Sequence, residues 1–234
     1  MRYVKKILQK VFPFIPPDWK KPRISYSQCG EDILIDFVFQ QLHLSKISYL
    51  DIGANDPVFL NNTYWFYKRG SNGICVEPNP ALFKNIKRKR SRDLCVNAGV
   101  GVSDQREIDF YIIDPDTLST FSKESAEVSV KAGYHLKNVV QIPLIPVGNI
   151  IEQYLGHAPH LVSLDTEGLD LQILQSFNYA LYRPIVFCVE TVAFMETKKI
   201  KPIFDLMEEN NYFVYADTFL NTIFVDRVFW SKHT

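Results

Sequence analysis

Glycine and acidic side chains follow two short apolar runs in this 234-residue sequence. The first run ends at Gly53, where a buried strand is expected to turn into a loop, and the second ends at Glu77. A glycine at a strand end lets backbone N–H groups approach a ligand closely, and a helix start favours negative charge. A carboxylate after the second strand suits the two hydroxyls of a ribose. The spacing therefore predicts a nucleotide-type binding site with the candidate ligands Asp51, Gly53, Asn55 and Glu77.

Two classes of enzyme place an acid at the end of the second strand: dehydrogenases that use a dinucleotide and methyltransferases that use S-adenosylmethionine (SAM). The dehydrogenase fingerprint, G-x-G-x-x-G, has three glycines that let a diphosphate reach a helix start. Here Gly53 stands alone, and Asp56 would repel a diphosphate where that ligand needs positive potential. A cationic sulfonium meets no such repulsion. The residues therefore favour SAM as the cofactor.

A second acidic cluster, Asp165, Glu167 and Asp170, lies at the end of the expected strand 160–165. Open parallel sheets bind ligands at the carboxyl ends of their strands, so we expect this cluster to stand opposite Gly53. Acids in a first helical turn also cap exposed N–H groups, but Asp165 precedes that turn. We predict that Asp165 is the catalytic base for an acceptor hydroxyl, with Glu167 orienting the acceptor or assisting through a metal.

His135 is an alternative base, because histidine titrates near neutral pH, although a lone histidine is more often a surface residue. The three carboxylates of the second acidic cluster also suit Mg²⁺, which prefers oxygen ligands. Nothing in the sequence fixes the remaining ligands. No metal-binding residue is therefore assigned, and a need for Mg²⁺ stays open.

Three motifs carry a resemblance to a known family: Asp51–Pro57 (DIGANDP), Val76–Pro80 (VEPNP) and Ser163–Asp170 (SLDTEGLD). Together, in this order, they resemble the FkbM family of SAM-dependent methyltransferases, over residues 27–225. The resemblance implies a class I (Rossmann-like) methyltransferase fold and O-methylation of sugars or sugar-containing natural products. One departure is that Asp56 and Pro57 stand where many members carry a further glycine.

The resemblance also implies further cofactor ligands. Related sequences carry a stretch similar to Ser27–Asp32 near the methionine end of the cofactor, which makes Gln28 and Glu31 candidates. In class I methyltransferases the end of the third strand lies over the adenine, so Ser103 and Asp104 are candidates for binding its exocyclic amine.

The elements that must position these side chains alternate between strand and helix, which predicts an α/β fold. We expect a seven-stranded, mostly parallel sheet that finishes with a C-terminal antiparallel strand. The seven strands expected in this sheet are 47–52, 73–77, 93–98, 160–165, 184–190, 212–216 and 222–225. A further strand is expected at 107–113. One helix is expected between Asp32 and Leu42. Further helices are expected at 61–69, 80–90, 148–155, 169–177 and 200–210.

The chain is predicted to consist of a basic amphipathic segment, residues 1–24, and a methyltransferase domain, residues 25–234. Residues 1–15 place apolar side chains at helical spacing between lysines, so they can lie on an anionic membrane surface or dock as a helix on the domain or a partner. An insertion at about 114–146 is polar and weakly periodic. We expect it to be an irregular segment over the site that supplies substrate contacts.

Five basic side chains lie within the expected helix 80–90, and two interpretations compete for them. They could bind a phosphate, or they could complement the negative end of the helix while facing water. We favour the second interpretation for the whole set. The five are Lys84, Lys87, Arg88, Lys89 and Arg90.

The composition excludes several classes of function. Lys plus Arg equals Asp plus Glu at 26 each, so no global field favours a nucleic acid. The four cysteines show no C-x-x-C spacing, which indicates neither a zinc site nor a disulfide framework and fits a reducing compartment. No apolar run is long enough to span a membrane. We expect a cytoplasmic protein, with peripheral contact at the inner membrane face through residues 1–15 as an alternative.

The favoured function is SAM-dependent methylation of a hydroxyl on a sugar, a glycan or another small molecule. A second possibility is a catalytically inactive protein of the same fold that acts as a binding partner in glycan assembly. A third, an oxidoreductase that uses NAD, lacks the glycines and a well-placed Tyr-x-x-x-Lys pair. Tyr64 and Lys68 have that spacing, but they lie on a helix next to the first strand, away from the expected site.

Overall fold

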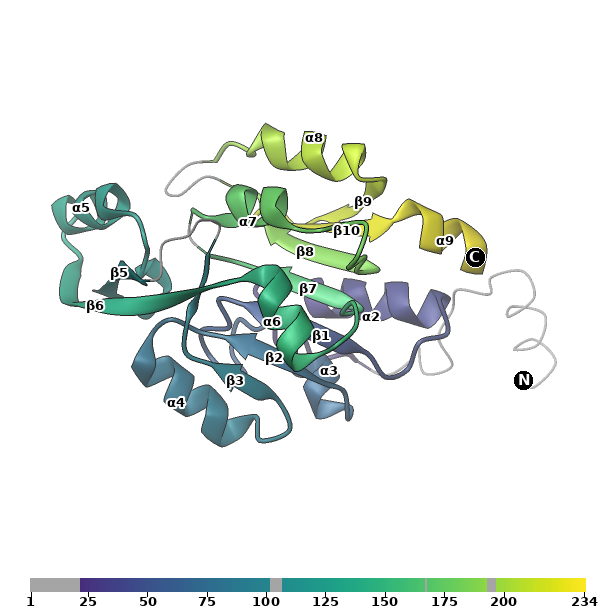
Figure 1. Cartoon of the computed structure of the whole chain (residues 1–234), viewed down its shortest axis with the longest axis horizontal. Coiled ribbons are helices and arrows are strands. Elements are labelled where there is room, and N and C mark those ends of the chain that lie inside the picture. Colours follow the sequence, from purple (N-terminus) through teal and green to yellow (C-terminus); the bar gives the residue numbers. More distant parts are fainter. Residues whose placement is uncertain (1–21, 102–106, 167, 193–196) are drawn as a thin grey trace.

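A computed structural model describes residues 22–101, 107–166, 168–192 and 197–234 of the chain. The fold is built on a seven-stranded sheet with the order β3-β2-β1-β7-β8-β10-β9 (Figure 1). The strands are β1 (Ser48–Ile52), β2 (Asn72–Val76), β3 (Leu94–Val96), β7 (Leu161–Leu164), β8 (Val186–Glu190), β9 (Tyr212–Asp217) and β10 (Asn221–Asp226). β10 pairs antiparallel with β8 and β9, whereas the other pairs are parallel. The structure confirms the predicted sheet.

The central strands are buried on both faces, as expected for parallel strands that helices cover on either side. All residues of β7 are buried, and β8 is buried as far as Val189. β1 lies between β2 and β7 in parallel register, with Ile52 opposite both Val76 and Leu164. The carboxyl ends of these strands therefore meet at one edge of the sheet.

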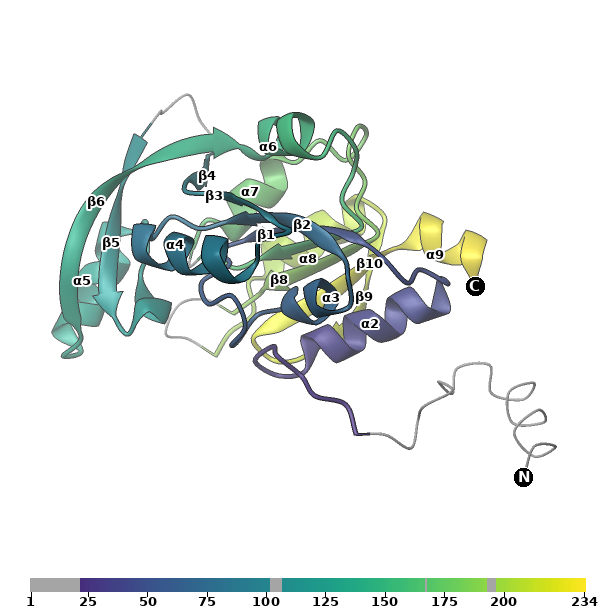
Figure 2. The ribbon, with the colours of Figure 1, turned by 90° about the horizontal axis from the view of Figure 1, so that it is seen from below.

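Helices cover both faces of the sheet (Figure 2). They are α2 (Glu31–Gln41), α3 (Tyr64–Lys68), α4 (Pro80–Lys89), α6 (Val147–Tyr154), α7 (Asp170–Ser176), α8 (Lys201–Glu209) and α9 (Arg227–His233). One face packs against α6, α7 and α8 through Ile150, Ile173 and Ile203. The opposite face packs against α2 and α3 through Phe39 and Phe66.

Residues 99–101 and 107–146 form a second unit, which we call the arm. It contains β4 (Gly99–Gly101), β5 (Glu107–Asp114), the 3₁₀ turn η1 (Asp116–Leu118), α5 (Lys123–Lys131) and β6 (His135–Pro146). Its three strands have the order β4-β6-β5, and β5 pairs antiparallel with β6. In Figures 1 and 2 the arm projects from the end of the molecule opposite the C-terminus.

The expectation of an irregular insertion at 114–146 is wrong, because the structure has a helix and a twelve-residue strand there. The prediction failed for a physical reason. The side chains from His135 to Val139 are all exposed, so this half of β6 lacks the alternation of polar and apolar residues that marks a half-buried strand.

The helix expected at 61–69 is shorter in the structure, because side chains replace its first helical hydrogen bonds. Asn61 Oδ1 accepts the backbone N–H groups of Thr63 and Tyr64 at 3.0 and 2.8 Å. This arrangement leaves only Tyr64–Lys68 as α3. The terminal helix α9 was not predicted; the side chain of Asp226 caps it by accepting the N–H of Val228.

The expectation that Arg90 faces water is also wrong, because its side chain is fully buried. Its guanidinium lies 2.6 Å from Asp93 and 3.5 Å from Asp51. The rings of Tyr49 and Tyr67 lie against it, each with its centroid 5.3 Å from the guanidinium carbon. A buried cation needs partners of this kind, since desolvation without them is very costly. Helical spacing did not reveal this role because four neighbouring basic residues are exposed on the same helix.

The predicted amphipathic segment lies almost entirely outside the described residues, which begin at position 22. None of the helices in the described part of the chain is long and apolar enough to cross a membrane.

Candidate active site

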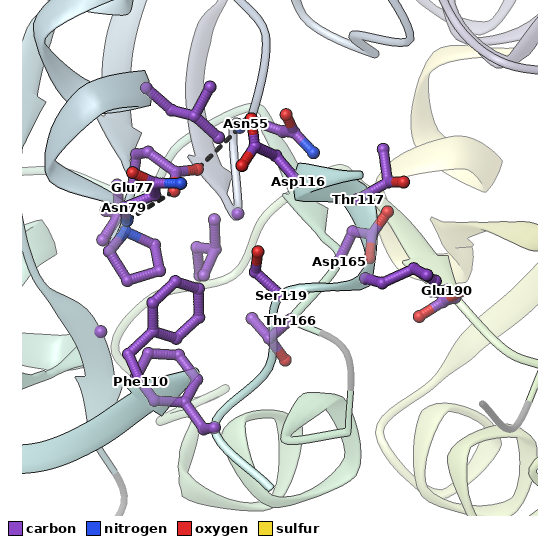
Figure 3. Close-up of a pocket in the computed structure, with 18 of the residues that line it drawn as sticks. Asn55, Glu77, Asn79, Phe110, Asp116, Thr117, Ser119, Asp165, Thr166 and Glu190 are labelled. Atoms are coloured by element: carbon purple, nitrogen blue, oxygen red, sulfur yellow. Dashed lines mark hydrogen bonds between the residues drawn. The ribbon is translucent and has the colours of Figure 1, made fainter. Parts of the chain in front are cut away.

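A cavity of about 430 Å³ lies where the carboxyl ends of β1, β2, β7 and β8 meet (Figure 3). Each strand end contributes to its wall, with Gly53, Glu77, Asp165 and Glu190 among the lining residues. Figure 3 shows Glu77 and Asn79 on one side of the cavity and Asp165 and Glu190 on the other. Open α/β sheets bind ligands at this edge. The cavity is therefore the candidate active site.

Glu77 directly follows β2, and backbone donors hold its carboxylate. Oε2 accepts the N–H of Asn55 at 2.8 Å, and Oε1 accepts the N–H of Asn79 at 2.7 Å. The residue is only 4% exposed, and burial raises its pKa to about 7. Each carboxylate oxygen has a further lone pair that can accept a ligand hydroxyl. This geometry fits the ribose site that the sequence predicted.

The turn after β1 brings the backbones of two strands into contact. Gly53 has a φ of 79°, and a Cβ at this position would lie 1.8 Å from the backbone oxygen of Asp165. Any side chain here would therefore push β1 and β7 apart. Asn55 also has a positive φ, 48°, which asparagine tolerates better than most residues. The glycine is needed for the packing of the strand ends as well as for access to a ligand.

Asp165 and Glu190 form a carboxyl pair at the ends of neighbouring strands. β7 and β8 are in parallel register with Leu164 opposite Val189, so the next residues of the two strands adjoin. The two carboxyl side chains hydrogen-bond to each other. Burial, and then the charge of Asp170, raise the pKa of Asp165 to about 7. A carboxyl group with a pKa near 7 is suited to exchange a proton at neutral pH.

The charge of the cavity selects among ligands. Its acidic side chains are Glu77, Asp116, Asp165 and Glu190, and none of the described residues that line it is a Lys, Arg or His. Asp116 has a partner in Lys137, at 3.3 Å. A diphosphate would meet repulsion here, whereas a cation would lower the cost of burying several carboxylates. These residues fit SAM, whose sulfonium and amino groups are cationic.

The arm forms the wall beside Glu77. Phe110 and Phe121 line the cavity with their ring centroids 4.7 Å apart, and Phe110 is buried. Asp116 and Thr117 of η1 continue this wall. Aromatic rings are suited to pack against a flat, partly apolar group such as adenine. The arm therefore borders the space expected for the cofactor, whereas the sequence predicted substrate contacts from this segment.

The predicted cofactor ligands fall into two groups. Those that line the cavity are Gln28, Gly53, Asn55 and Glu77. Glu31 is buried, is not among the described lining residues, and forms hydrogen bonds with other side chains of the protein. Its Oε1 accepts hydrogen bonds from the side chains of Thr218 at 2.6 Å and Asn221 at 3.1 Å. Glu31 thus fastens the start of α2 to the turn between β9 and β10.

Asp51 is the second predicted ligand that is not among the described lining residues. Its Oδ2 accepts hydrogen bonds from Thr63 Oγ1 at 2.7 Å and Asn61 Nδ2 at 3.2 Å, and Arg90 lies 3.5 Å away. Asn61 Nδ2 also donates to two backbone carbonyls of the turn after β1. Neighbouring side chains of a strand point to opposite faces of the sheet, and Asp51 points away from the cavity. Through Asn61, Asp51 stabilises the turn after β1 from the face of the sheet opposite the cavity.

Four predicted site residues remain. Glu167, Ser103 and Asp104 lie outside the described residues. His135, the alternative base, is exposed at the start of β6 and is not among the described lining residues. No group of three or more side chains suited to hold a metal ion occurs in the described part of the chain, so Mg²⁺ finds no support there.

Sequence analysis missed Glu190, Asn79 and the aromatic pair of the arm as site residues. A signal for Glu190 was present, because the expected strand 184–190 ends on an acid just as the strand before Glu77 does. The pair Phe110 and Phe121 gave no such signal. Their role depends on how the arm folds back on the sheet, which local spacing does not encode.

A second cavity, of about 210 Å³, adjoins the first. Asp170 and Gln172 at the start of α7 contribute to its wall. Glu190 and Val192 line both cavities. Glu190 therefore stands between two neighbouring spaces, one of which contains Glu77.

Comparison with protein families matches residues 51–214 to a family described as the methyltransferase FkbM domain. The matched range includes the four strand ends that form the cavity. No curated protein matches the sequence.

Three solved structures illustrate the distant likeness of the chain to known folds. A TehB-like SAM-dependent methyltransferase from Corynebacterium glutamicum is 10% identical, with 96% of this chain and 98% of that chain covered and a TM-score of 0.47. A methyltransferase from Geobacter sulfurreducens is 8% identical, with 95% and 87% covered and a TM-score of 0.48. The 1,6-didemethyltoxoflavin-N1-methyltransferase from Burkholderia thailandensis, solved with S-adenosylhomocysteine, is 12% identical, with 96% and 88% covered and a TM-score of 0.42.

Proposed function

Since the chain belongs to the FkbM family of SAM-dependent methyltransferases, we propose that it methylates a hydroxyl of a sugar or glycan. One observation carries the proposal. In a single cavity, a buried acid suited to a ribose, Glu77, faces a carboxyl pair suited to deprotonate an alcohol, Asp165 with Glu190. Family membership supports methyl transfer from SAM, and the sugar hydroxyl as acceptor is what we add to it.

When bound, SAM supplies a methyl group on a good leaving group. The chain then has to hold the two reactants in line and exclude water. In the proposal Glu77 accepts hydrogen bonds from the ribose hydroxyls, and the turn at Gly53 supports the middle of the cofactor. Phe110 and Phe121 exclude water from the adenine side.

Asp165 is the proposed base, and Glu190 shares the proton that it receives. An alcohol is a poor nucleophile until its proton is removed in or near the transition state. With SAM bound, the acceptor oxygen would form a bond to the methyl carbon as the bond from that carbon to sulfur breaks and S-adenosylhomocysteine is left, while the O–H proton would pass to Asp165. Burial and the charge of Asp170 raise the pKa of Asp165 to about 7, so this carboxylate holds a proton more tightly than an exposed aspartate does. Asp165 is therefore a stronger base than an exposed aspartate.

The second cavity supports a hydroxylated acceptor. It shares Glu190 with the cofactor cavity, so a ligand there lies next to the proposed base. Asp170 and Gln172 offer carboxylate and amide groups, which can bind the several hydroxyls of one sugar ring. A space of about 210 Å³ suits a single ring better than an extended chain.

The proposal is tested by incubating the purified chain with methyl-labelled SAM and a panel of methyl glycosides. We expect a labelled methyl ether, whose position nuclear magnetic resonance then identifies. SAM binding without transfer to any sugar would contradict the acceptor class. Absence of SAM binding would contradict the cofactor site itself.

Replacing Glu77 with Gln should weaken SAM binding by about 10- to 100-fold, as expected for losing charge-assisted hydrogen bonds to two hydroxyls. The amide nitrogen of Gln also cannot accept one of the two backbone N–H groups that Glu77 holds. Isothermal titration calorimetry measures the effect. Glu152→Gln, an exposed change on α6, is the control and should bind SAM normally. An unchanged dissociation constant for Glu77→Gln would remove the ribose assignment.

SAM binding should release protons near pH 6.5. Glu77 and Asp165 each have a pKa of about 7 in the ligand-free chain, and a nearby cation favours their ionised forms. Affinity should therefore rise with pH through 7 and level off once both carboxyls are ionised. Calorimetry in buffers of different ionisation enthalpy counts the protons released.

The amino group of SAM titrates in a similar range, so the wild-type value alone is not decisive. The comparison with Asp165→Asn isolates the contribution of one carboxyl. The variant should release fewer protons than the wild type at pH 6.5. Equal release by the two proteins would show that Asp165 does not lose a proton when SAM binds.

A further inference from the structure

Apolar side chains surround the polar cavity on two loops. Phe59 and Leu60 end the turn after β1, and Phe219 and Leu220 form the turn between β9 and β10. Phe59 is 69% exposed and Phe219 is 56% exposed. Their neighbours Leu60 and Leu220 line the cavity itself. We call these four residues the apolar rim.

One short segment joins the two loops into a continuous rim. The carbonyl of Tyr26 accepts the backbone N–H of Asn61 at 2.9 Å, next to Leu60. At the other end, Glu31 accepts the Thr218 hydroxyl at 2.6 Å, next to Phe219. Gln28, between these contacts, lines the cavity. Leu60 and Leu220 therefore border the same opening, and the exposed Phe59 and Phe219 adjoin them in the chain.

The backbone holds two of these four residues in uncommon conformations. Leu60 has a φ of 52° and Phe219 a φ of 75°, values that are uncommon for bulky side chains. Hydrogen bonds fix both loops: Asp56 Oδ1 accepts the N–H of Phe59, and Asp217 Oδ1 accepts the N–H of Phe219, each at 2.8 Å. Strained residues that the surroundings hold in place occur often at ligand sites. Scattered exposed apolar residues are ordinary, but two strained loops at one cavity mouth are not.

We propose that the apolar rim binds the apolar part of an amphiphilic acceptor while its hydroxylated head lies at Asp165 and Glu190. The inference rests on the proposed function, because only a transferase needs an acceptor at this opening. The interior of the cavity offers carboxylates for hydroxyl groups, and its mouth offers phenyl and leucine side chains for a hydrocarbon chain or aglycone. The acceptor class is thus a glycoside with an apolar substituent.

The test compares methyl β-D-glucopyranoside with n-octyl β-D-glucopyranoside, both below the micelle concentration and with the protein saturated in S-adenosylhomocysteine. The two ligands share a head group and differ in chain length. Each methylene that the rim buries should tighten binding by about fourfold. We therefore expect the octyl glycoside to bind at least about tenfold more tightly, from the burial of two or more methylenes. Calorimetry or saturation-transfer resonance measures the dissociation constants.

Two variants distinguish binding at the apolar rim from nonspecific hydrophobic binding elsewhere on the surface. Phe59→Ser with Phe219→Asn should abolish most of the octyl preference, and Asn tolerates the positive φ at position 219. Leu181→Ser is the matched control. Leu181 is 65% exposed on the loop that enters β8, at the opposite edge of the sheet from the cavity. It should leave the octyl preference unchanged.

The outcomes distinguish this inference from the proposed function. If the wild type does not bind S-adenosylhomocysteine, the proposed function fails. If it binds S-adenosylhomocysteine but shows no octyl preference, the rim proposal fails, and methyl transfer to the glycoside panel separately decides the sugar acceptor. Equal loss in Leu181→Ser would also overturn the rim proposal. Sedimentation with phosphatidylcholine vesicles provides a further arm. Suppose that the wild type binds vesicles but shows no octyl preference, and that the double variant no longer binds vesicles. The rim would then bind a membrane surface, and its proposed role in binding the acceptor would be overturned.

Discussion

Replacing Asp165 with Asn is expected to lower the kcat of methyl transfer by about 10²- to 10⁴-fold, the range that general-base catalysis contributes. Asn keeps the size of the side chain and its hydrogen bond to Glu190 but cannot take up the acceptor proton. The measurement is single-turnover transfer from methyl-labelled SAM to the sugar acceptor that the glycoside panel identifies. Asp205→Asn, an exposed change on α8, should have wild-type activity.

The pH dependence of the same reaction separates a base from a merely structural residue. In the wild type, kcat/KM should rise with pH through about 7, where Asp165 loses its proton. The rise should become less steep in Asp165→Asn, because only Glu77 then still loses a proton near pH 7. Turnover that survives in Asp165→Asn with normal SAM binding would transfer the role of base to another group.

Replacing Arg90 with Met is expected to lower the free energy of unfolding by about 3–5 kcal/mol. The substitution leaves the buried carboxylates of Asp51 and Asp93 without their cation. It also removes hydrogen bonds to Asn61 Oδ1 at 3.1 Å and Thr63 Oγ1 at 2.8 Å. Urea denaturation should show a lower midpoint with an unchanged slope, since the folded core stays the same.

The control for this variant is Arg88→Met on the same helix. Arg88 is exposed, so its replacement should change the free energy of unfolding by less than about 0.5 kcal/mol. A similar, small effect of both substitutions would mean that the Asp51 and Asp93 carboxyls are held neutral in the folded chain. In that case the network would be one of neutral hydrogen bonds and the ion-pair description would be wrong.

The sequence was sufficient to predict the sheet and the strand ends that border the site. Parallel strands buried on both faces appear as uninterrupted apolar runs, and their carboxyl ends share one edge of the sheet. Gly53, Glu77 and Asp165 follow such runs directly, so their common location could be inferred without coordinates. The same reasoning applied to the strand ending at Glu190 would have added the partner of Asp165.

Other features depend on contacts between distant segments. Arg90 has the same local pattern as its exposed neighbours, and only the arrival of Tyr49, Asp51 and Asp93 makes it a buried cation. Asp51 was predicted to be a cofactor ligand because it lies two residues before Gly53, yet its side chain points to the face of the sheet that is opposite the cavity. The arm had weak periodicity because much of β6 is exposed on both faces.

The contact between Gly53 and the backbone of Asp165 ties the donor site to the base. A Cβ at position 53 would lie 1.8 Å from that backbone oxygen, so the two strand ends are locked together as one rigid piece. The apolar rim, by contrast, lies on loops outside the sheet. Substitutions in the apolar rim can therefore change which acceptor fits without altering the spacing of the reacting groups.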